Sequence, residues 1–195
     1  MLNSTQMLNS IYLNQSVQTQ VRDAFSNATP IPSITLYETL NLTTLTALCE
    51  SMLTLHFKHT KNPLLYSFAT VPLPQNIQKE LSASLLPFVS YITKKKRTKL
   101  SLTAYKLSWK DYQILHDSLQ PQKSTQIIID LTPVWNLEAG GTITYVDGTG
   151  EYLSVPIKNN TLTIIEKNKD VNHFIQYINN KAKTQSRYFL MGTVE

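Results

Sequence analysis

The spacing of hydrophobic residues changes once along the chain, close to Arg97. Before Arg97, apolar residues recur every three or four positions and predict helices from Val17, after Asn41 and after Asn76, with short strands at residues 33–37 and 64–71. After Arg97, apolar and polar residues alternate in about eight short segments with no helical spacing between them. Helices followed by a run of strands predict an α+β fold whose second half is an antiparallel sandwich or jelly roll.

Cap and turn residues predict where some of these elements begin and end. Asn41 is expected to cap the helix that follows it, because an asparagine side chain can accept hydrogen bonds from the first free N–H groups of a helix. Pro87 lies inside the helix after residue 76 and is expected to kink or split it. Asp147 and Gly148, followed by Gly150, predict a β-hairpin.

The chain has 195 residues, which is enough for one hydrophobic core, and we expect one domain. Residues 1–16 are rich in Asn, Gln, Ser and Thr and are expected to form a loose N-terminal arm. Residues 17–195 are expected to form a single domain with a helical first half, 17–97, and a β-rich second half, 98–195.

The composition favours a soluble protein of a reducing compartment. Cys49 is the only cysteine, so no intramolecular disulfide can form. No apolar run reaches the ~18 residues of a membrane helix, and the N-terminus lacks the basic start and apolar core of a secretory signal. The net charge of +5 comes partly from the run at residues 94–97, which is expected to be a solvated turn rather than a nucleic-acid site. We therefore expect a cytoplasmic protein without membrane contacts and without direct nucleic-acid binding.

Two histidines and one arginine in the β-rich half are candidates for a functional site. A mononuclear non-haem iron site needs two imidazoles and one carboxylate on one face of the metal, and a barrel can bring such ligands together from distant strands. His116 ends one predicted strand, His173 begins another, and Arg187 follows on a strand expected to run back antiparallel to that of His173. The guanidinium fork of Arg187 suits a bidentate pair with a carboxylate. His56 and His59 could also bind a metal, but their expected place in a last helical turn favours a role in complementing the helix dipole.

Other recognisable sequence segments lie before, between and around these three residues. They are residues 21–28 with Pro30, Pro32 and Ile34; residues 86–93; residues 111–117; Trp135 with Gly140 and Gly141; Pro156, Asn160 and Leu162; and residues 173–178. Together they resemble the 2-oxoglutarate and iron(II)-dependent oxygenases of the prolyl hydroxylase type. The resemblance is strongest to the branch whose eukaryotic members hydroxylate a proline of a small-subunit ribosomal protein, and it covers residues 21–194.

The resemblance implies a double-stranded β-helix (jelly roll) core with N-terminal and packing helices. It implies a dioxygenase that uses iron(II), 2-oxoglutarate as co-substrate and O2 to hydroxylate a peptidyl, in that branch prolyl, side chain. His116 and His173 would bind the metal, and Arg187 would bind the co-substrate. The implied partner is a protein or peptide substrate. The branch named above implies a ribosomal protein as one such substrate.

The residues after His116 depart from the family motif, in which an acidic residue stands two positions after the histidine. Here Ser118 has that position and Asp117 is adjacent to the histidine. Either Asp117 turns inward through a bulge and completes the ligand set His116, Asp117 and His173, or two histidines remain. Adjacent strand residues point to opposite faces, which disfavours the bulge. The alternative function is a non-catalytic jelly-roll protein that binds a peptide or ribosomal partner, favoured by Ser118 and by the basic run at residues 94–97.

Overall fold

The structure is a computed structural model that describes residues 7–115 and 124–195. Its α-helices are α1 (Gln15–Asn27), α2 (Leu42–Thr54) and α3 (Gln75–Thr93), and its 3-10 helices are η1 (Ser10–Leu13), η2 (Leu137–Ala139) and η3 (Asn180–Ala182). Its strands are β1 (Ser33–Tyr37), β2 (Lys58–Asn62), β3 (Tyr66–Pro72), β4 (Leu100–Leu107), β5 (Tyr112–Gln113), β6 (Ser124–Asp130), β7 (Ile143–Val146), β8 (Tyr152–Val155), β9 (Thr161–Lys167), β10 (Asn172–Ile175) and β11 (Arg187–Val194).

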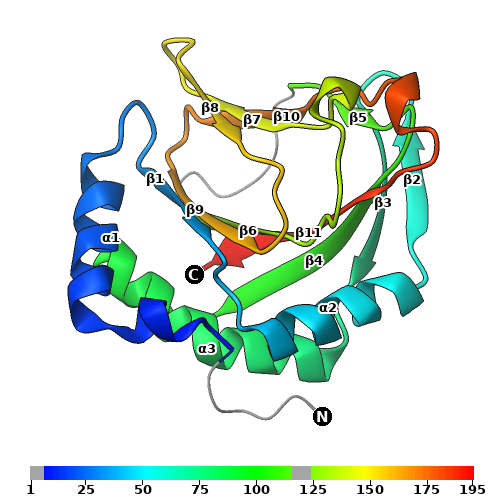
Figure 1. The fold of residues 1–195 in the computed structure, drawn as a ribbon. Helices are drawn as coiled ribbons and strands as arrows, with labels where there is room; N and C mark the ends of the chain where they lie inside the picture. Colours follow the sequence, from blue (N-terminus) through cyan, green and yellow to red (C-terminus); the bar gives the residue numbers. More distant parts are fainter. Residues whose placement is uncertain (1–6, 116–123) are drawn as a thin grey trace.

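The strands form one antiparallel sheet that folds over on itself. They follow one another in the order β1-β9-β6-β11-β4-β3-β5-β10-β7-β8, with β2 paired to β3. The sheet turns between β3 and β5, so that two walls face each other (Figure 1). We call β1, β9, β6, β11, β4 and β3 the larger wall, and β5, β10, β7 and β8 the smaller wall. The three α-helices lie against the outer side of the larger wall (Figure 1).

This arrangement confirms the predicted fold class, an α+β protein with a jelly-roll core and packing helices. The helices come first along the chain and cover the outer face of the larger wall, because that face carries an apolar side chain at every second position. Within the described ranges, no helix combines the length and the apolar character needed to cross a membrane.

The middle strands of the larger wall are buried on both faces. In β6, Ile127 and Ile129 pack in the apolar cluster under the helices, whereas Ile128 packs between the two walls. A continuous run of isoleucines is what a strand covered on both sides requires, since neighbouring side chains point to opposite faces. We call the space between the walls the barrel interior. Its buried apolar residues are Ile31, Leu107, Ile128, Ala139, Ile143, Tyr145, Val155, Ile165, Val171, Ile175, Ile178, Ala182, Phe189 and Met191.

The predicted cap of α2 is confirmed, and of the predicted kink or split in α3 the split does not occur. The side-chain oxygen of Asn41 accepts a hydrogen bond of 2.8 Å from the backbone N–H of Thr44. Helix α3 continues through Pro87 without being split. Leu85 and Phe88, which lie on either side of Pro87 in the sequence of this helix, are 1% and 4% exposed. A proline costs a helix about 3 kcal/mol, and burying two such side chains contributes a similar or larger amount, so packing retains the helix.

The predicted hairpin joins β7 to β8. The carboxylate of Asp147 accepts hydrogen bonds from the backbone N–H groups of Thr149 at 2.9 Å and Glu151 at 3.0 Å. Gly150 adopts a φ of 88°, which glycine tolerates better than other residues. Strong turn chemistry therefore brings these two strands together locally.

The first described residues differ from the loose arm that the sequence predicts. Met7 and Leu8 are each 3% exposed and belong to the cluster under the helices. Leu8 pairs with Leu40, and the carbonyl of Met7 accepts a hydrogen bond of 2.9 Å from the N–H of Asn41. The surrounding polar residues concealed these two apolar anchors. The division of the chain into an arm, 1–16, and one domain, 17–195, stays a prediction.

The histidines near residue 56 do not occupy the last turn of a helix. Helix α2 ends at Thr54, and His59 lies in β2. The Nε2 atom of His59 is 3.1 Å from Oδ1 of Asp111, and the hydroxyl of Ser67 donates to the same oxygen at 2.8 Å. The predicted interaction of His56 and His59 with the helix dipole is therefore wrong for His59, which instead contacts a buried carboxylate.

The basic run at residues 94–97 is only partly the solvated turn that was expected. The side chain of Arg97 is 12% exposed, and its Nη2 atom lies 3.2 Å from Oε2 of Glu166 on β9. Lys95 forms an ion pair with the same carboxylate. The end of α3 is thus attached to the larger wall through Glu166.

Candidate functional site

His173 points into the barrel interior from the smaller wall. It lies on β10 opposite Tyr145 of β7 in the strand register and is 8% exposed. The side-chain nitrogen of Gln113 is 3.3 Å from Nε2 of His173. An amide nitrogen can only donate, so with this amide orientation Nε2 accepts and the ring proton resides on Nδ1. The ring of Tyr145, with its centroid 5.3 Å away, packs against the imidazole.

Tyr145 connects the two walls across the barrel interior. Its side chain is completely buried, and its hydroxyl donates a hydrogen bond of 2.8 Å to Oε1 of Gln126 on β6. Burial raises the pKa of this phenol far above its usual range, so the hydroxyl stays protonated. Sequence reasoning missed Tyr145, although its alternation with Ile143 could have indicated an inward-facing side chain.

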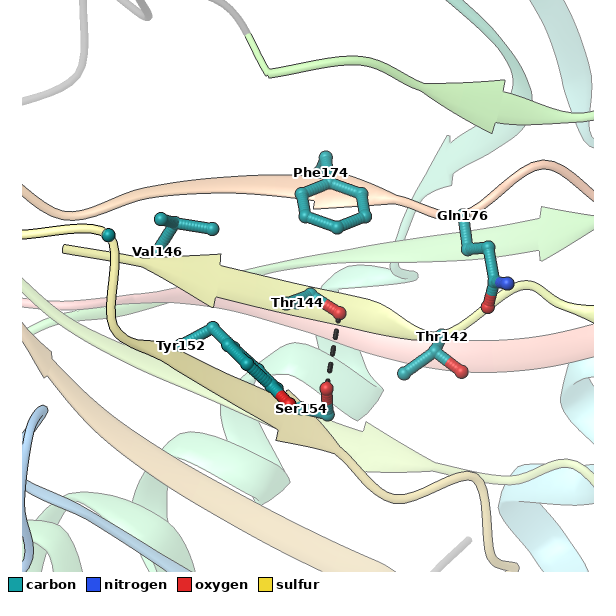
Figure 2. A pocket seen from close by; sticks show the side chains of 8 residues that line it. Thr142, Thr144, Val146, Tyr152, Ser154, Phe174 and Gln176 are labelled. Atoms are coloured by element: carbon teal, nitrogen blue, oxygen red, sulfur yellow. Dashed lines mark hydrogen bonds between the residues drawn. The ribbon is translucent and has the colours of Figure 1, made fainter.

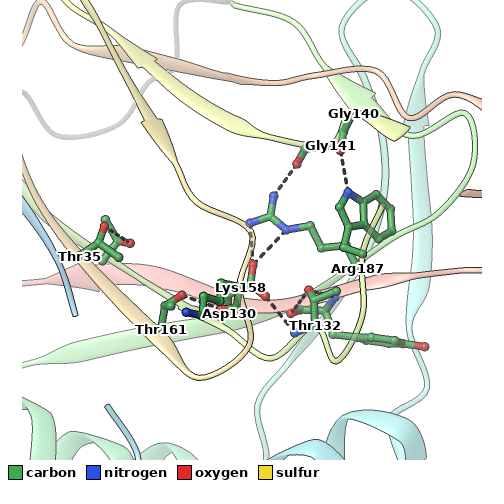
Figure 3. A network of polar contacts seen from close by, with 11 residues as sticks. Thr35, Asp130, Thr132, Gly140, Gly141, Lys158, Thr161 and Arg187 are labelled. Carbon is green, nitrogen blue, oxygen red and sulfur yellow. Dashed lines mark hydrogen bonds and ion pairs between the residues drawn. The ribbon is translucent and has the colours of Figure 1, made fainter. Parts of the chain in front are cut away.

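Arg187 points into the barrel interior from the larger wall, where it meets Asp130. Its Nε and Nη2 atoms donate to Oδ2 of Asp130 at 3.1 and 2.8 Å, and its Nη1 atom donates to the carbonyl of Gly141 (Figure 3). The side chains of Arg187 and Asp130 are 0% and 1% exposed. The other carboxylate oxygen of Asp130 accepts a hydrogen bond of 2.9 Å from the N–H of Thr132. The guanidinium of Arg187 also lies 4.7 Å from the ring centre of Phe189.

Asp130 is the second residue that sequence reasoning missed. It follows Ile127, Ile128 and Ile129 directly, so it ends a strand that the pattern already indicated to be buried. A carboxylate in such a strand requires a partner, because an unpaired buried charge is very unfavourable. That signal was available, but the identity of the partner was not.

The paired glycines and Trp135 hold the loop that contacts Arg187. Gly140 and Gly141 have φ values of 83° and 82°, and a Cβ atom on Gly140 would lie 2.3 Å from the carbonyl oxygen of Tyr177. The indole N–H of Trp135 donates a hydrogen bond of 2.9 Å to the carbonyl of Gly140 (Figure 3). This arrangement directs the next carbonyl, that of Gly141, at Arg187.

Asn160 has a structural contact outside the barrel interior. Its side-chain oxygen accepts a hydrogen bond of 2.8 Å from the N–H of Leu40, and its side-chain nitrogen donates one of 3.0 Å to the carbonyl of Leu40. It therefore attaches the turn before β9 to the start of α2.

The strand of Arg187 does not pair with the strand of His173, contrary to the expectation that it would run back beside it. β10 pairs with β5 and β7 in the smaller wall, whereas β11 pairs with β4 and β6 in the larger wall. The two residues thus enter the barrel interior from opposite walls. Segment 176–186 crosses from one wall to the other, which is the connection that a jelly roll requires.

The jelly roll thus receives polar side chains from both walls. No protein-family model matches the chain, and no curated protein sequence does. A solved prolyl hydroxylase from Trichoplax adhaerens, in complex with a peptide fragment of hypoxia inducible factor, superposes with a TM-score of 0.76 at 12% identity, covering 98% of this chain and 94% of that one. A 2OG-Fe(II) oxygenase family oxidoreductase from Burkholderia pseudomallei gives 0.73 at 10% identity, with coverage of 93% and 92%. A prolyl-4-hydroxylase from Pseudomonas putida gives 0.72 at 10% identity, with coverage of 90% and 98%.

The chain has the fold of a prolyl hydroxylase-type 2-oxoglutarate oxygenase. The predicted resemblance is confirmed at the level of the fold, and it extends over almost the whole chain. The resemblance to the ribosomal branch stays a prediction.

The other predicted metal ligands of this oxygenase fold, His116 and Asp117, lie outside the described residues, as does Ser118. Among residues 7–115 and 124–195, no group of three His, Cys, Asp or Glu side chains is arranged to hold a metal. The ligand set His116, Asp117 and His173 therefore stays a prediction.

The two site residues within the described ranges differ in how well they fit their predicted roles. His173 is compatible with a metal ligand, because its buried imidazole points into the barrel interior, but a metal at Nε2 would have to replace the contact of 3.3 Å with the side-chain nitrogen of Gln113. Arg187 does not fit a bidentate pair with a free distal carboxylate, because Asp130 already accepts hydrogen bonds from its Nε and Nη2 atoms. The chain thus has the arginine that the resemblance implies for the co-substrate, but Asp130 supplies a carboxylate to it from within the chain.

A separate hollow lies on the outer face of the smaller wall. It has a volume of about 440 Å³ and is lined by uncharged residues, which include Thr144, Ser154 and Phe174 (Figure 2). Because strand side chains alternate, Thr144 points outward where its neighbour Tyr145 points into the barrel interior. This hollow is therefore on the opposite side of the wall from His173.

Lys167 at the end of β9 should reduce stability at neutral pH. It is 5% exposed, no carboxylate of the described residues lies within ion-pair distance, and burial lowers its pKa below the usual 10.5. Lys167→Met should raise the free energy of unfolding by about 1 kcal/mol at pH 7, because the charged amine loses hydration only in the folded chain. Urea denaturation followed by circular dichroism would measure this change.

The gain in the free energy of unfolding from Lys167→Met should decrease as the pH rises. It is present in full below the lowered pKa of the folded state and disappears as the pH rises above 10.5, where the amine is neutral in both states. An equal gain at pH 7 and at high pH would instead attribute the effect to packing.

Proposed function

We propose that the chain is an iron(II)-dependent oxygenase that couples the oxidation of a 2-oxo acid to hydroxylation of a peptidyl side chain, with proline as the predicted target. The observation that supports this proposal most is that His173 and Arg187 both point into the interior of one jelly roll. The same fold occurs in an oxidoreductase whose family name includes both 2-oxoglutarate and iron(II). 2-Oxoglutarate is the co-substrate that the resemblance implies.

The chain's own residues would hold the metal and keep water away from it. His173 would offer Nε2 after releasing its contact with the Gln113 amide, and the tilted ring of Tyr145 would pack against the imidazole. His116 and Asp117 are the proposed remaining ligands. When bound, iron(II) with a 2-oxo acid supplies O2-dependent oxidative decarboxylation, in which one oxygen atom enters the acid product and the other a substrate C–H bond.

The proposed partner is a protein or peptide. This proposal is supported by the peptide in the complex of the prolyl hydroxylase from Trichoplax adhaerens, whose fold this chain shares. A ribosomal protein as the substrate rests on the sequence resemblance. A cytoplasmic location rests on the single cysteine, Cys49, and stays a prediction.

Iron binding tests the proposal. The wild-type protein, purified without metal and titrated anaerobically with iron(II), should bind about one equivalent, and His173→Ala or His116→Ala should weaken binding by about tenfold or more. His56→Ala is the matched control, because His56 is exposed and lies outside the barrel interior. Release of labelled CO2 from carboxyl-labelled 2-oxo acids should follow the same order of variants.

Two results would contradict the proposal. One is a folded wild-type protein that binds no iron(II). The other is iron binding that His56→Ala weakens as much as His173→Ala does, since the metal would then lie elsewhere.

A further inference from the structure

We propose that Asp130 determines which 2-oxo acid the site accepts: with Asp130 bound to Arg187, the site takes a 2-oxo acid with a short uncharged tail and rejects a diacid such as 2-oxoglutarate. This inference rests on the proposed function, because it concerns the acid that the proposed oxygenase would consume. It starts from the contacts of Arg187 inside the barrel interior.

The hydrogen-bonding fork of Arg187 is already occupied. A guanidinium has five N–H donors, and its side-on fork consists of Nε and Nη2. Both atoms of this fork donate to Oδ2 of Asp130, and Nη1 donates to the carbonyl of Gly141 (Figure 3). An incoming carboxylate would therefore have to share the guanidinium with Asp130 or displace it.

Sharing the guanidinium is unfavourable because the pair is electrically neutral and buried. Arg187 and Asp130 are 0% and 1% exposed, so little solvent screens a further charge placed next to them. The repulsion from Asp130 would offset the attraction of a second carboxylate to Arg187, so the hydration that this carboxylate loses would stay uncompensated and would weaken binding by about a hundredfold or more.

Displacing Asp130 is unfavourable as well. Its second oxygen accepts a hydrogen bond of 2.9 Å from the N–H of Thr132, which orients the carboxylate toward Arg187. If it moved away, a buried anion would lose its only cationic partner among the described residues. Asp130 therefore stands where the resemblance would place the distal carboxylate of the co-substrate.

The surroundings of the pair suit an uncharged tail. The ring of Phe189 lies 4.7 Å from the guanidinium carbon of Arg187, and Leu107, Ile128 and Met191 belong to the same apolar cluster. A methyl or ethyl group can pack against such side chains without losing a hydrogen bond. The site should thus distinguish the two classes of acid by charge rather than by length.

Calorimetric titration of the whole protein, loaded with manganese(II) in place of iron(II), tests this inference. The two ligands are 2-oxoglutarate and 2-oxopentanoate, which has the same five-carbon chain without the distal carboxylate. The wild-type protein should bind 2-oxopentanoate at least about tenfold more tightly. Asp130→Ala should reverse this preference, because it leaves an unpaired guanidinium in a space that a carboxylate can fill.

A second readout does not require a metal. 2-Oxoglutarate should raise the melting temperature of metal-free Asp130→Ala and leave that of the wild-type protein unchanged. The double variant Asp130→Ala/Arg187→Met should lose this response, because it lacks the cation. If Asp130→Ala does not fold, the closer substitution Asp130→Asn replaces it, and the wild-type titration alone still decides the preference.

The outcomes separate this inference from the proposed function. A wild-type protein that binds the metal and prefers 2-oxoglutarate, with that preference lost in Arg187→Met, would overturn the role of Asp130 and leave the oxygenase intact. A wild-type protein that binds no metal would overturn the oxygenase. In that case, 2-oxoglutarate binding by metal-free Asp130→Ala but not by the wild-type protein would still support Asp130 as the residue that excludes the diacid.

Discussion

Arg187→Met should lower the free energy of unfolding by about 3–5 kcal/mol, because it leaves the buried carboxylate of Asp130 without a cation. Arg187 is 0% exposed, and two of its nitrogens donate to Oδ2 of Asp130. Methionine fills part of the same space but can donate no hydrogen bond. Urea denaturation followed by circular dichroism, with wild type and variant at the same pH, would measure the difference.

Removing both charges should restore most of that stability. In Arg187→Met/Asp130→Leu no buried charge is left without a partner, and apolar side chains can replace a buried ion pair at little net cost. As a matched control, Lys181→Met breaks the ion pair with Glu138 and should leave stability almost unchanged, because the side chains of Lys181 and Glu138 are 50% and 73% exposed. A double variant no more stable than Arg187→Met would show that packing, rather than charge, causes the loss.

Gly192→Ala should destabilise the sheet by about 3 kcal/mol or more, because the new methyl group has no space. A Cβ atom at Gly192 would lie 1.8 Å from the carbonyl oxygen of Ser101 and 3.0 Å from Cα of Leu102. These are backbone atoms of β4, the strand paired with β11, so relief requires the two strands to separate. The expected readout is a large fall in melting temperature or a loss of folded protein on expression.

Gly150→Ala is the control for this prediction. Gly150 has a φ of 88°, but no heavy atom lies within 4 Å of a Cβ placed there. Its substitution should cost about 1 kcal/mol, which is the strain of a left-handed conformation without a clash. If Gly192→Ala costs no more than Gly150→Ala, then β4 and β11 can adjust and the close approach is not a constraint.

Local chemistry made much of the architecture predictable. The change of hydrophobic period near Arg97 predicted helices followed by strands, Asn41 predicted the cap of α2, and Asp147 with Gly148 predicted the hairpin between β7 and β8. Each of these features depends on residues within a few positions of one another. The sequence therefore contained enough information for the fold class and for many of the elements.

The same reasoning failed where distant residues meet. The spacing of His173 and Arg187 suggested neighbouring strands, whereas strand pairing places them in opposite walls. The polar composition of residues 1–16 also did not indicate that Met7 and Leu8 would pack in an apolar cluster formed by residues far along the chain. Which strands become neighbours depends on the burial of whole faces, and a local pattern does not specify that.

The candidate site, like the fold, could be predicted from the sequence only in part. The residue types indicated the chemistry, since an imidazole and a guanidinium in a β-rich half are suited to a metal and a carboxylate. Only folding brings Asp130 to Arg187, 57 positions away in the sequence, and so supplies the carboxylate from within the chain. The charge of a buried site depends on which side chains share it. The preference for an oxo acid with or without a second carboxylate is therefore a property of the three-dimensional arrangement.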